Sequence, residues 1–281
     1  MANVVINDFS SQTVSQADDS FVIQEAGGTT KKMSKLLLAQ SIAYAGYKSY
    51  DTFTATRPSV STVTVGWAQL GIEGIIAGAQ SLTLDITASG LLGLDTGSEN
   101  ADAWYYIYAI AKTDGTVSAI FSASSTAPTM PAGYTLKRLV SMVRNTSGDF
   151  IDFFQYNNSC QYVNALEIYS NSVAGAVSTD IDARTKIPAI LNLKKVSIYA
   201  SVSGQNSDNL IDLSMRLASS DHSTQRKTQS VIYNSVYFTI TLQGDILTTG
   251  DGYVSYYFTS TGAYPTTSVH TVNCHGFEIP L

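Results

Sequence analysis

Apolar residues along this chain occur in short runs, many of them alternating with polar positions, which is the periodicity of β-strands. The densest run covers residues 104–111, WYYIYAIA, where aromatic and β-branched residues occupy both faces of a strand. Asp114-Gly115 then supplies a two-residue hairpin signal. Because neither face of this run is polar, we expect a central strand buried on both sides, or one buried in a subunit interface, and not a platform for sugars.

Three more strands are predicted after the hairpin signal, at residues 117–121, 136–144 and 150–155. Prolines make residues 127–133 a rigid connection, and residues 145–149 form a turn. With a turn or connection between successive strands, we expect the four strands to form one sheet in meander order.

The region before the aromatic strand has weaker strand signals, at residues 50–56, 60–68 and 80–87. Residues 71–78 are rich in small side chains and are interpreted as a connection. Apolar side chains alternate with polar ones within 60–68, which predicts that one face of that strand is buried. They are Val63, Val65 and Trp67.

The N-terminal region predicts a hairpin followed by a short helix. Residues 21–24 and 29–33 flank Gly27-Gly28, and Ser34 is placed to cap a helix at residues 35–45. Isolated helices shorter than about 12–15 residues are marginal in water, so this one requires a packing partner.

The C-terminal part is again predicted to be β-structure, after a polar boundary at Asn157-Asn158-Ser159. Short strands separated by glycine-containing turns are typical of a sandwich or jelly roll. The expected strands cover residues 165–170, 185–187, 195–203, 210–218, 230–242, 253–259 and 269–277. We therefore expect an all-β protein of antiparallel β-sandwich or jelly-roll domains. The expected division is a short N-terminal segment (1–46) and two β-domains (47–157 and 158–281).

Composition narrows the functional classes. Charged residues make up only 14% of the chain, against about 25% in typical proteins, and the net charge is −6. This argues against sequence-independent nucleic-acid binding, which needs clustered Lys and Arg. No apolar run approaches the length of about 18 residues that suggests a membrane-spanning helix, so we expect no membrane insertion.

Cysteine and histidine are too scarce to indicate a cofactor or metal site. Only Cys160 and Cys274 are present, which excludes a disulfide framework and leaves open whether the two are close. The histidines, His222, His270 and His275, form no obvious catalytic group. Neighbours in a strand point to opposite faces, so Cys274 and His275 are not expected to share a metal.

The acidic residues give only a weak indication of catalytic activity. A glycan hydrolase needs two carboxylates roughly 5–10 Å apart, and the pairs with suitable spacing are Asp180 with Asp182 and Asp208 with Asp212. The acids of residues 95–102 match no calcium-loop spacing, so we expect a solvated turn there. No nucleophile elbow, phosphate loop or dinucleotide motif is present, and we expect no catalytic residues and no enzyme activity.

Exposed tyrosines are the remaining candidates for recognition, because their rings provide large amphipathic contact areas. We place the receptor candidates in C-terminal loops, and which of them bind is left open. They are Tyr253, Tyr256, Tyr264 and His222.

Two stretches of this chain resemble bacteriophage tail-fibre and head-fibre proteins. The closer likeness is carried by WYYIY at 104–108, DG at 114–115, FS at 121–122, TAPTMPAGYTLKR at 126–138, SG at 147–148 and FQ at 154–155. Residues 19–38, DSFVIQEAGGTTKKMSKLLL, are similar to the N-terminal segments with which many phage fibres begin. A bacterial carbohydrate-binding module is less attractive as an interpretation because of this N-terminal segment.

The resemblance implies a non-enzymatic structural protein of a phage virion, assembled in the host cytoplasm and exposed on the particle. It implies that residues 1–46 dock on another virion protein, that the chain forms a homotrimer, and that the C-terminal β-domains face outward to bind a host-surface glycan or protein. The alternative for residues 1–46 is that they form the first hairpin of the globular domain. Multivalency would strengthen weak single contacts. A head-decorating or connecting protein without receptor binding is the main alternative, and a capsule depolymerase is a lesser one.

Overall fold

The computed structural model describes residues 20–24, 30–34, 50–189, 195–205, 211–219, 227–233, 237–246, 253–260 and 267–279. Within them, every regular element is a strand, and all paired strands run antiparallel. The expected all-β, antiparallel fold is therefore confirmed.

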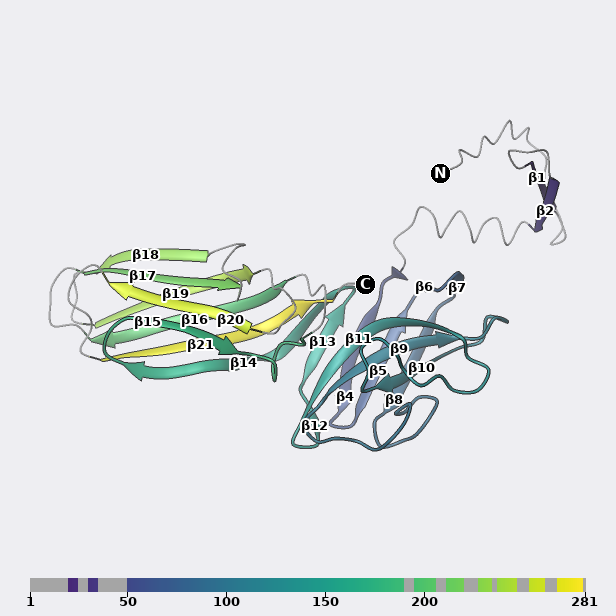
Figure 1. The fold of residues 1–281 in the computed structure, drawn as a ribbon, viewed down its shortest axis with the longest axis horizontal. Helices are drawn as coiled ribbons and strands as arrows, with labels where there is room; N and C mark the ends of the chain where they lie inside the picture. Colours follow the sequence, from purple (N-terminus) through teal and green to yellow (C-terminus); the bar gives the residue numbers. More distant parts are fainter. Residues whose placement is uncertain are drawn as a thin grey trace.

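One eight-stranded sheet runs through both halves of the molecule and organises the fold (Figure 1). Its strand order is β19-β16-β21-β14-β13-β4-β5-β8. The strands are β4 (Thr54–Ser59), β5 (Thr62–Trp67), β8 (Gln80–Asp85), β13 (Phe153–Tyr156), β14 (Ser159–Val173), β16 (Val196–Gln205), β19 (Tyr237–Ile246) and β21 (Thr267–Glu278). The long strand β14 joins the halves, because its first residues pair with β13 and residues from both of its ends pair with β21.

A four-stranded sheet covers one half of this sheet and completes an N-terminal sandwich. It has the order β10-β9-β11-β12 and consists of β9 (Trp104–Ala111), β10 (Val117–Ser122), β11 (Leu136–Thr146) and β12 (Asp149–Phe150). Every residue of β9 after the first is buried, which confirms the expected double burial. The rings of Tyr105, Phe121 and Phe150 pack on one another with centroids 5.3–6.4 Å apart.

The alternation predicted within residues 60–68 is also present. Val63 and Val65 are completely buried and Trp67 is 4% exposed, while the residues between them in β5 are partly exposed. Hydrogen bonds join the two layers deep inside the sandwich. Ser141 on β11 donates to Gln155 Oε1 on β13 at 2.7 Å, and Gln155 Nε2 donates to the Val140 carbonyl at 3.0 Å.

The predicted meander is wrong in its pairing order. Strand β11 pairs with β9 and not with β10, so β9 is central. The reason is that residues 92–95 already occupy the other edge of β10: Phe121 N donates to the Gly93 carbonyl and Asp95 N donates to the Phe121 carbonyl, both at 2.8 Å. The predicted fourth strand is also divided, because β12 ends at Phe150 and β13 begins at Phe153 in the other sheet.

A small three-stranded sheet contains a hairpin where the sequence predicted a connection. Its strands are β3 (Tyr50–Asp51), β6 (Gln69–Ile72) and β7 (Ile75–Ala77), in the order β3-β6-β7. The hairpin turns at Glu73-Gly74, both at positive φ, a conformation that glycine adopts readily. Leu70 and Ile72 are buried, which the short glycine-rich sequence did not reveal.

A second four-stranded sheet covers the other half and completes a C-terminal sandwich. Its order is β15-β20-β17-β18, with β15 (Val177–Asp182), β17 (Ile211–Ser219), β18 (Lys227–Tyr233) and β20 (Tyr253–Ser260). Val254, Phe258, Val202 and Val272 contribute buried side chains from the two layers.

Two of the predicted C-terminal strands are wrong. Residues 185–187 form a turn in which Lys186 N and Ile187 N both donate to the Ala183 carbonyl, and the strand lies earlier, at β15. This turn is held against the N-terminal sandwich, since Trp104 Nε1 donates to the Arg184 carbonyl at 2.8 Å. The predicted strand 230–242 is two strands, β18 and β19, that belong to different sheets.

The predicted N-terminal hairpin is confirmed, because β1 (Ser20–Gln24) pairs with β2 (Thr30–Ser34). The predicted helix at 35–45 and most of the 1–46 segment lie outside the described residues. The eight-stranded sheet continues across residues 157–158 through the β13–β14 pairing, so the proposed domain boundary there stays a prediction. No helix long and apolar enough to cross a membrane occurs in the described part of the chain.

Candidate functional site

An aromatic pair lies on the surface of the eight-stranded sheet, on the face that points away from the sandwich cores. Along β13, Phe153 and Gln155 are 2% exposed whereas Phe154 and Tyr156 are 44% and 56% exposed. Residues two apart in a strand point to the same side, so both rings lie on one surface. Val163 on β14 is 55% exposed. We call this surface the outer face and Phe154 with Tyr156 the aromatic pair.

Hydroxyl and amide side chains flank the aromatic pair. Thr56 on β4 and Gln161 on β14 are the direct partners of Phe154, and Thr54 and Ser159 are those of Tyr156. Directly opposed residues in a sheet share a face. One row of successive partners consequently crosses the whole sheet. From β8 to β19 it consists of Thr83, Thr64, Thr56, Phe154, Gln161, Gly276, Ser197 and Asp245.

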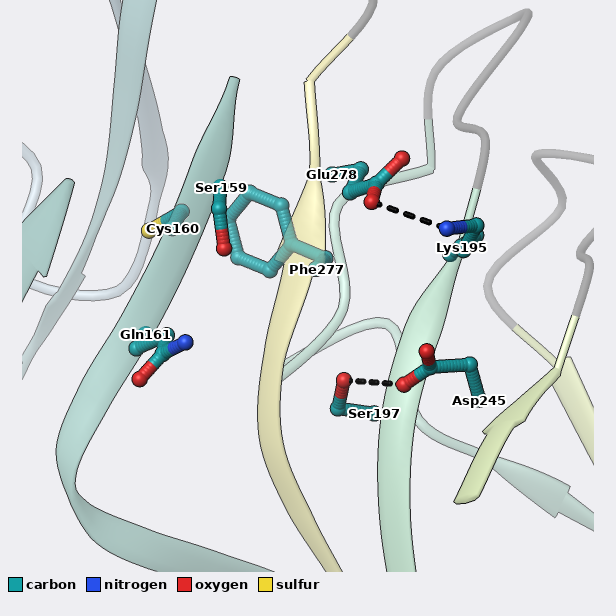
Figure 2. A pocket seen from close by; sticks show the side chains of 8 residues that line it. All are labelled: Ser159, Cys160, Gln161, Lys195, Ser197, Asp245, Phe277 and Glu278. Carbon is teal, nitrogen blue, oxygen red and sulfur yellow. Dashed lines mark hydrogen bonds and ion pairs between the residues drawn. The ribbon is translucent and has the colours of Figure 1, made fainter. Parts of the chain in front are cut away.

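A polar pocket of about 180 Å³ opens on the same row, next to the direct partners of the aromatic pair on β14. Figure 2 shows the side chains that line it. Gly276 supplies no side chain between Gln161 and Ser197 in the cross-strand register. A Cβ at this position would lie 2.2 Å from the Cys160 carbonyl oxygen, so only glycine fits. The pocket is lined by Ser159, Cys160, Gln161, Lys195, Ser197, Asp245, Phe277 and Glu278.

Two polar contacts order the side chains of the pocket, and both are drawn in Figure 2. Lys195 Nζ lies 3.1 Å from Glu278 Oε1, and Ser197 Oγ donates to Asp245 Oδ1 at 2.5 Å. The hydrogen bond to Glu278 and the charge of that carboxylate raise the pKa of Lys195. The pocket therefore holds two carboxylates against one ammonium.

The base of the pocket is rigid. Phe277 and Cys160 are 3% and 1% exposed. The Phe277 ring meets the rings of Trp104 and Tyr162 edge to face, each with centroids 6.0 Å apart. Except for Lys195, which directly precedes β16, the polar side chains above lie on strands, which favours a fixed binding geometry.

The receptor candidates predicted from the sequence are not all in exposed loops. Tyr256 is not in a loop: it lies in β20 and is completely buried, so it is excluded as a surface contact. Tyr253 is partly exposed in the same strand, with the Arg184 guanidinium 5.1 Å from its ring centroid. Tyr264 and His222 lie outside the described residues.

Buried Tyr256 belongs to a hydrogen-bonded chain centred on His270. The Tyr256 hydroxyl is 2.7 Å from His270 Nδ1, Nε2 is 2.6 Å from Ser268 Oγ, and Ser268 Oγ donates to the Val173 carbonyl at 2.9 Å. Since Ser268 uses its proton on Val173, it accepts from Nε2–H, and Nδ1 accepts from Tyr256. With a neutral imidazole, each ring nitrogen and both hydroxyl groups of this hydrogen-bonded chain have a partner. Burial lowers the pKa of His270 to about 4.

Of the acidic pairs singled out as hydrolase candidates, Asp180 with Asp182 is the one whose side chains the structure describes. Asp180 and Asp182 are both exposed on β15, and their spacing of two places them on one face of the strand, as predicted. Arg184 bonds Asp182 at 2.7 and 2.9 Å and lowers the pKa of that carboxyl to about 2, so Asp182 is not a proton donor near neutrality. Asp208 lies outside the described residues, and Asp212 is described only as a position of β17.

The acids of the 95–102 loop bond to the chain itself. Asp95 accepts from Thr129 N at 2.7 Å, and Asp102 accepts from Ser147 N at 3.2 Å. Within the described residues, no group of three or more His, Cys, Asp or Glu side chains is arranged to hold a metal ion.

Cys160 and Cys274 are both buried and both free. Burial, with a smaller contribution from the charge of Cys274, raises the pKa of Cys160. Burial raises the pKa of Cys274 to about 12. His275 is partly exposed while Cys274 is not, which confirms that these neighbours face opposite sides of β21.

Sequence reasoning missed both the aromatic pair and the polar pocket. A signal for the pair is present in DFIDFFQY, where aromatic residues occupy both alternating sets of positions in one strand. The pocket had no such local signal, because its residues come from β14, β16, β19, β21 and the position before β16.

No protein-family model matches the sequence, and no curated protein matches it. Several solved structures resemble the fold. The carbohydrate-binding module TmCBM61, solved with β-1,4-galactotriose, is 10% identical and covers 43% of this chain and 70% of its own, with a TM-score of 0.24. A carbohydrate-binding module from the β-sandwich superfamily is 9% identical over 83% of this chain and 100% of its own, with a TM-score of 0.21.

An infectious bursal disease virus structure is 13% identical and covers 82% of this chain and 73% of its own, with a TM-score of 0.22. All of these TM-scores are below 0.5, so the similarities carry no argument about function. The all-β assignment stands on the strand pairing itself.

Proposed function

We propose that this chain is a surface protein of a bacteriophage virion that binds host-surface glycans through the outer face of its eight-stranded sheet. The observation that carries the glycan-binding part is the aromatic pair, with Phe154 and Tyr156 44% and 56% exposed on a face lined by hydroxyl and amide groups. The virion part is supported by the likeness of residues 19–38 and 104–155 to phage fibre proteins.

The chemistry of the outer face suits sugars. Aromatic rings offer apolar faces for the C–H surfaces of sugar rings, and burying such a ring fully is worth about 1.5–3 kcal/mol. Thr54, Thr56, Ser159 and Gln161 beside the rings can donate to and accept from sugar hydroxyls. A sheet surface with an apolar centre and polar surroundings matches a ligand whose faces are apolar and whose edges carry hydroxyls.

The proposed assembly completes this function. Residues 1–46 dock on another virion protein, and the chain forms a homotrimer, so several outer faces act together on one cell surface. Linking weak sites in this way raises the overall avidity without any new contact. The proposed role has no catalytic step, and Arg184 keeps Asp182, one of the sequence-derived candidates, ionised by an ion pair.

The test is binding of the purified full chain to host cells and to a glycan array. Phe154→Ala and Tyr156→Ala should each weaken binding about threefold to tenfold, the range expected for loss of one stacking ring. Val60→Ala is the matched control. Val60 is 47% exposed and is not part of the aromatic pair, so this variant removes exposed apolar surface away from the proposed site.

Equal binding by the double variant and the wild type would refute the proposed site. If the wild type binds neither cells nor glycans, the head-decorating or connecting role becomes the better interpretation.

A further inference from the structure

We propose that the polar pocket is a subsite that selects neutral, hydroxyl-rich sugars and rejects sugars bearing carboxylate or sulfate groups. This inference rests on the proposed glycan-binding function and names its ligand class. It concerns residues that are separate from the aromatic pair, namely Gln161, Lys195, Ser197, Asp245 and Glu278.

The pocket lies where a linked sugar chain crossing the aromatic pair would continue. Phe154, Gln161, Gly276, Ser197 and Asp245 are successive partners on β13, β14, β21, β16 and β19. Neighbouring strands lie about 4.8 Å apart, so the row from Phe154 to Asp245 spans about 19 Å. An oligosaccharide lying across the strands can therefore reach from the rings to Asp245 on the far side of the pocket, whereas a single sugar cannot.

The pocket groups are mainly hydrogen-bond acceptors. A carboxylate has about four acceptor positions and no donor. Ser197 uses one position on Asp245, and Lys195 bonds one oxygen of Glu278, so both carboxylates keep capacity for sugar hydroxyls. The Gln161 amide and the Ser159 hydroxyl both donate and accept. This set is matched to a ligand that brings many hydroxyl donors.

The charges of the pocket oppose an anionic ligand. Lys195, the cation lining the pocket, is already paired with Glu278, and Asp245 lines the same pocket. A carboxylate or sulfate that enters the pocket lies near two carboxylates and one ammonium, and that ammonium already forms an ion pair with Glu278. Placing like charges side by side is a common way to exclude a wrong partner. We expect the penalty to weaken binding about tenfold or more at low salt.

The test uses the full chain and a glycan array that carries matched neutral and uronate oligosaccharides, such as galactose with galacturonate oligomers and glucose with glucuronate oligomers. The wild type should prefer the neutral member of a pair by about tenfold or more at low salt, and the preference should shrink as salt rises. Asp245→Asn keeps the shape of the side chain and removes its charge. This variant should reduce the preference several-fold by strengthening uronate binding.

The control is Asp149→Asn, which makes the same change in net charge at an exposed position of β12 outside the pocket. It should leave the preference unchanged. Thermal unfolding of both variants establishes that they are folded.

Three outcomes are distinguishable. If Phe154→Ala weakens binding but Asp245→Asn leaves the neutral-to-uronate ratio unchanged, the subsite is refuted and the proposed function stands. If the wild type binds uronates as tightly as neutral sugars, the selectivity is refuted directly. If no oligosaccharide binds, both proposals fall.

Discussion

The stability of the C-terminal sandwich should fall sharply in mild acid because of His270. The imidazole is completely buried, and burial lowers its pKa from about 6.5 to about 4. Above pH 6.5 the ring is neutral in both folded and unfolded chains. Between about pH 6.5 and pH 4, His270 is protonated in the unfolded chain but stays neutral in the folded chain. The free energy of unfolding therefore decreases as the pH falls through this range and levels off below it.

The magnitude follows from the pKa change. At 1.36 kcal/mol for each pH unit, lowering the pKa from about 6.5 to about 4 corresponds to about 3 kcal/mol of stability lost between pH 7 and pH 4. The structural cause is specific. Protonated His270 carries a proton on Nδ1, which can then no longer accept from Tyr256, and the ring of Phe258, 4.8 Å away, offers no compensating charge.

The assay is denaturant unfolding monitored by far-UV circular dichroism at several pH values. His270→Gln supplies an amide that can accept from Tyr256 and donate to Ser268 without titrating. The difference in unfolding free energy between wild type and this variant should change by up to about 3 kcal/mol between pH 7 and pH 4. His275→Gln, on the partly exposed side of β21, is the control and should follow the wild type. Parallel pH profiles for wild type and His270→Gln would refute the reasoning.

Two further predictions concern packing and assembly. Gly276→Ala should cost at least about 2 kcal/mol or prevent folding, because its Cβ would lie 2.2 Å from the Cys160 carbonyl oxygen, whereas Gly78→Ala, with nothing within 4 Å, should be nearly neutral in thermal unfolding. Light scattering of the purified full chain should give the mass of a trimer, and a monodisperse monomer at micromolar concentration would contradict the proposed assembly.

The positions of the strands could largely be predicted from the sequence, because alternation and turn signals are carried by residues that are close together in the chain. The alternation of Val63, Val65 and Trp67 predicted one buried face, and the unbroken apolar run at 104–111 predicted burial on both. Asp114-Gly115 marked the hairpin correctly, with Gly115 at positive φ. In each of these cases the physical cause lies within a few residues.

Strand pairing could not be predicted in the same way. Phe121 in β10 bonds to Gly93 and Asp95, which are remote in the sequence, and this contact displaces β11 to the other edge of β9. Tyr256 was predicted to be an exposed loop residue, because no residue close to it in the sequence indicates that His270 packs against it. Such contacts depend on which edge or layer remains available after other segments have folded.

By itself the sequence determined an antiparallel all-β protein, a low content of charged residues, and the places where strands turn, since alternation and turn chemistry are local properties. Only the tertiary structure decided that Phe154, Gln161, Ser197 and Asp245 share one face, through a row that begins on β8 and ends on β19. The physical reason is that cross-strand register brings together residues far apart in the chain, and register is set by the pairing of whole strands and not by the residues that later form the site.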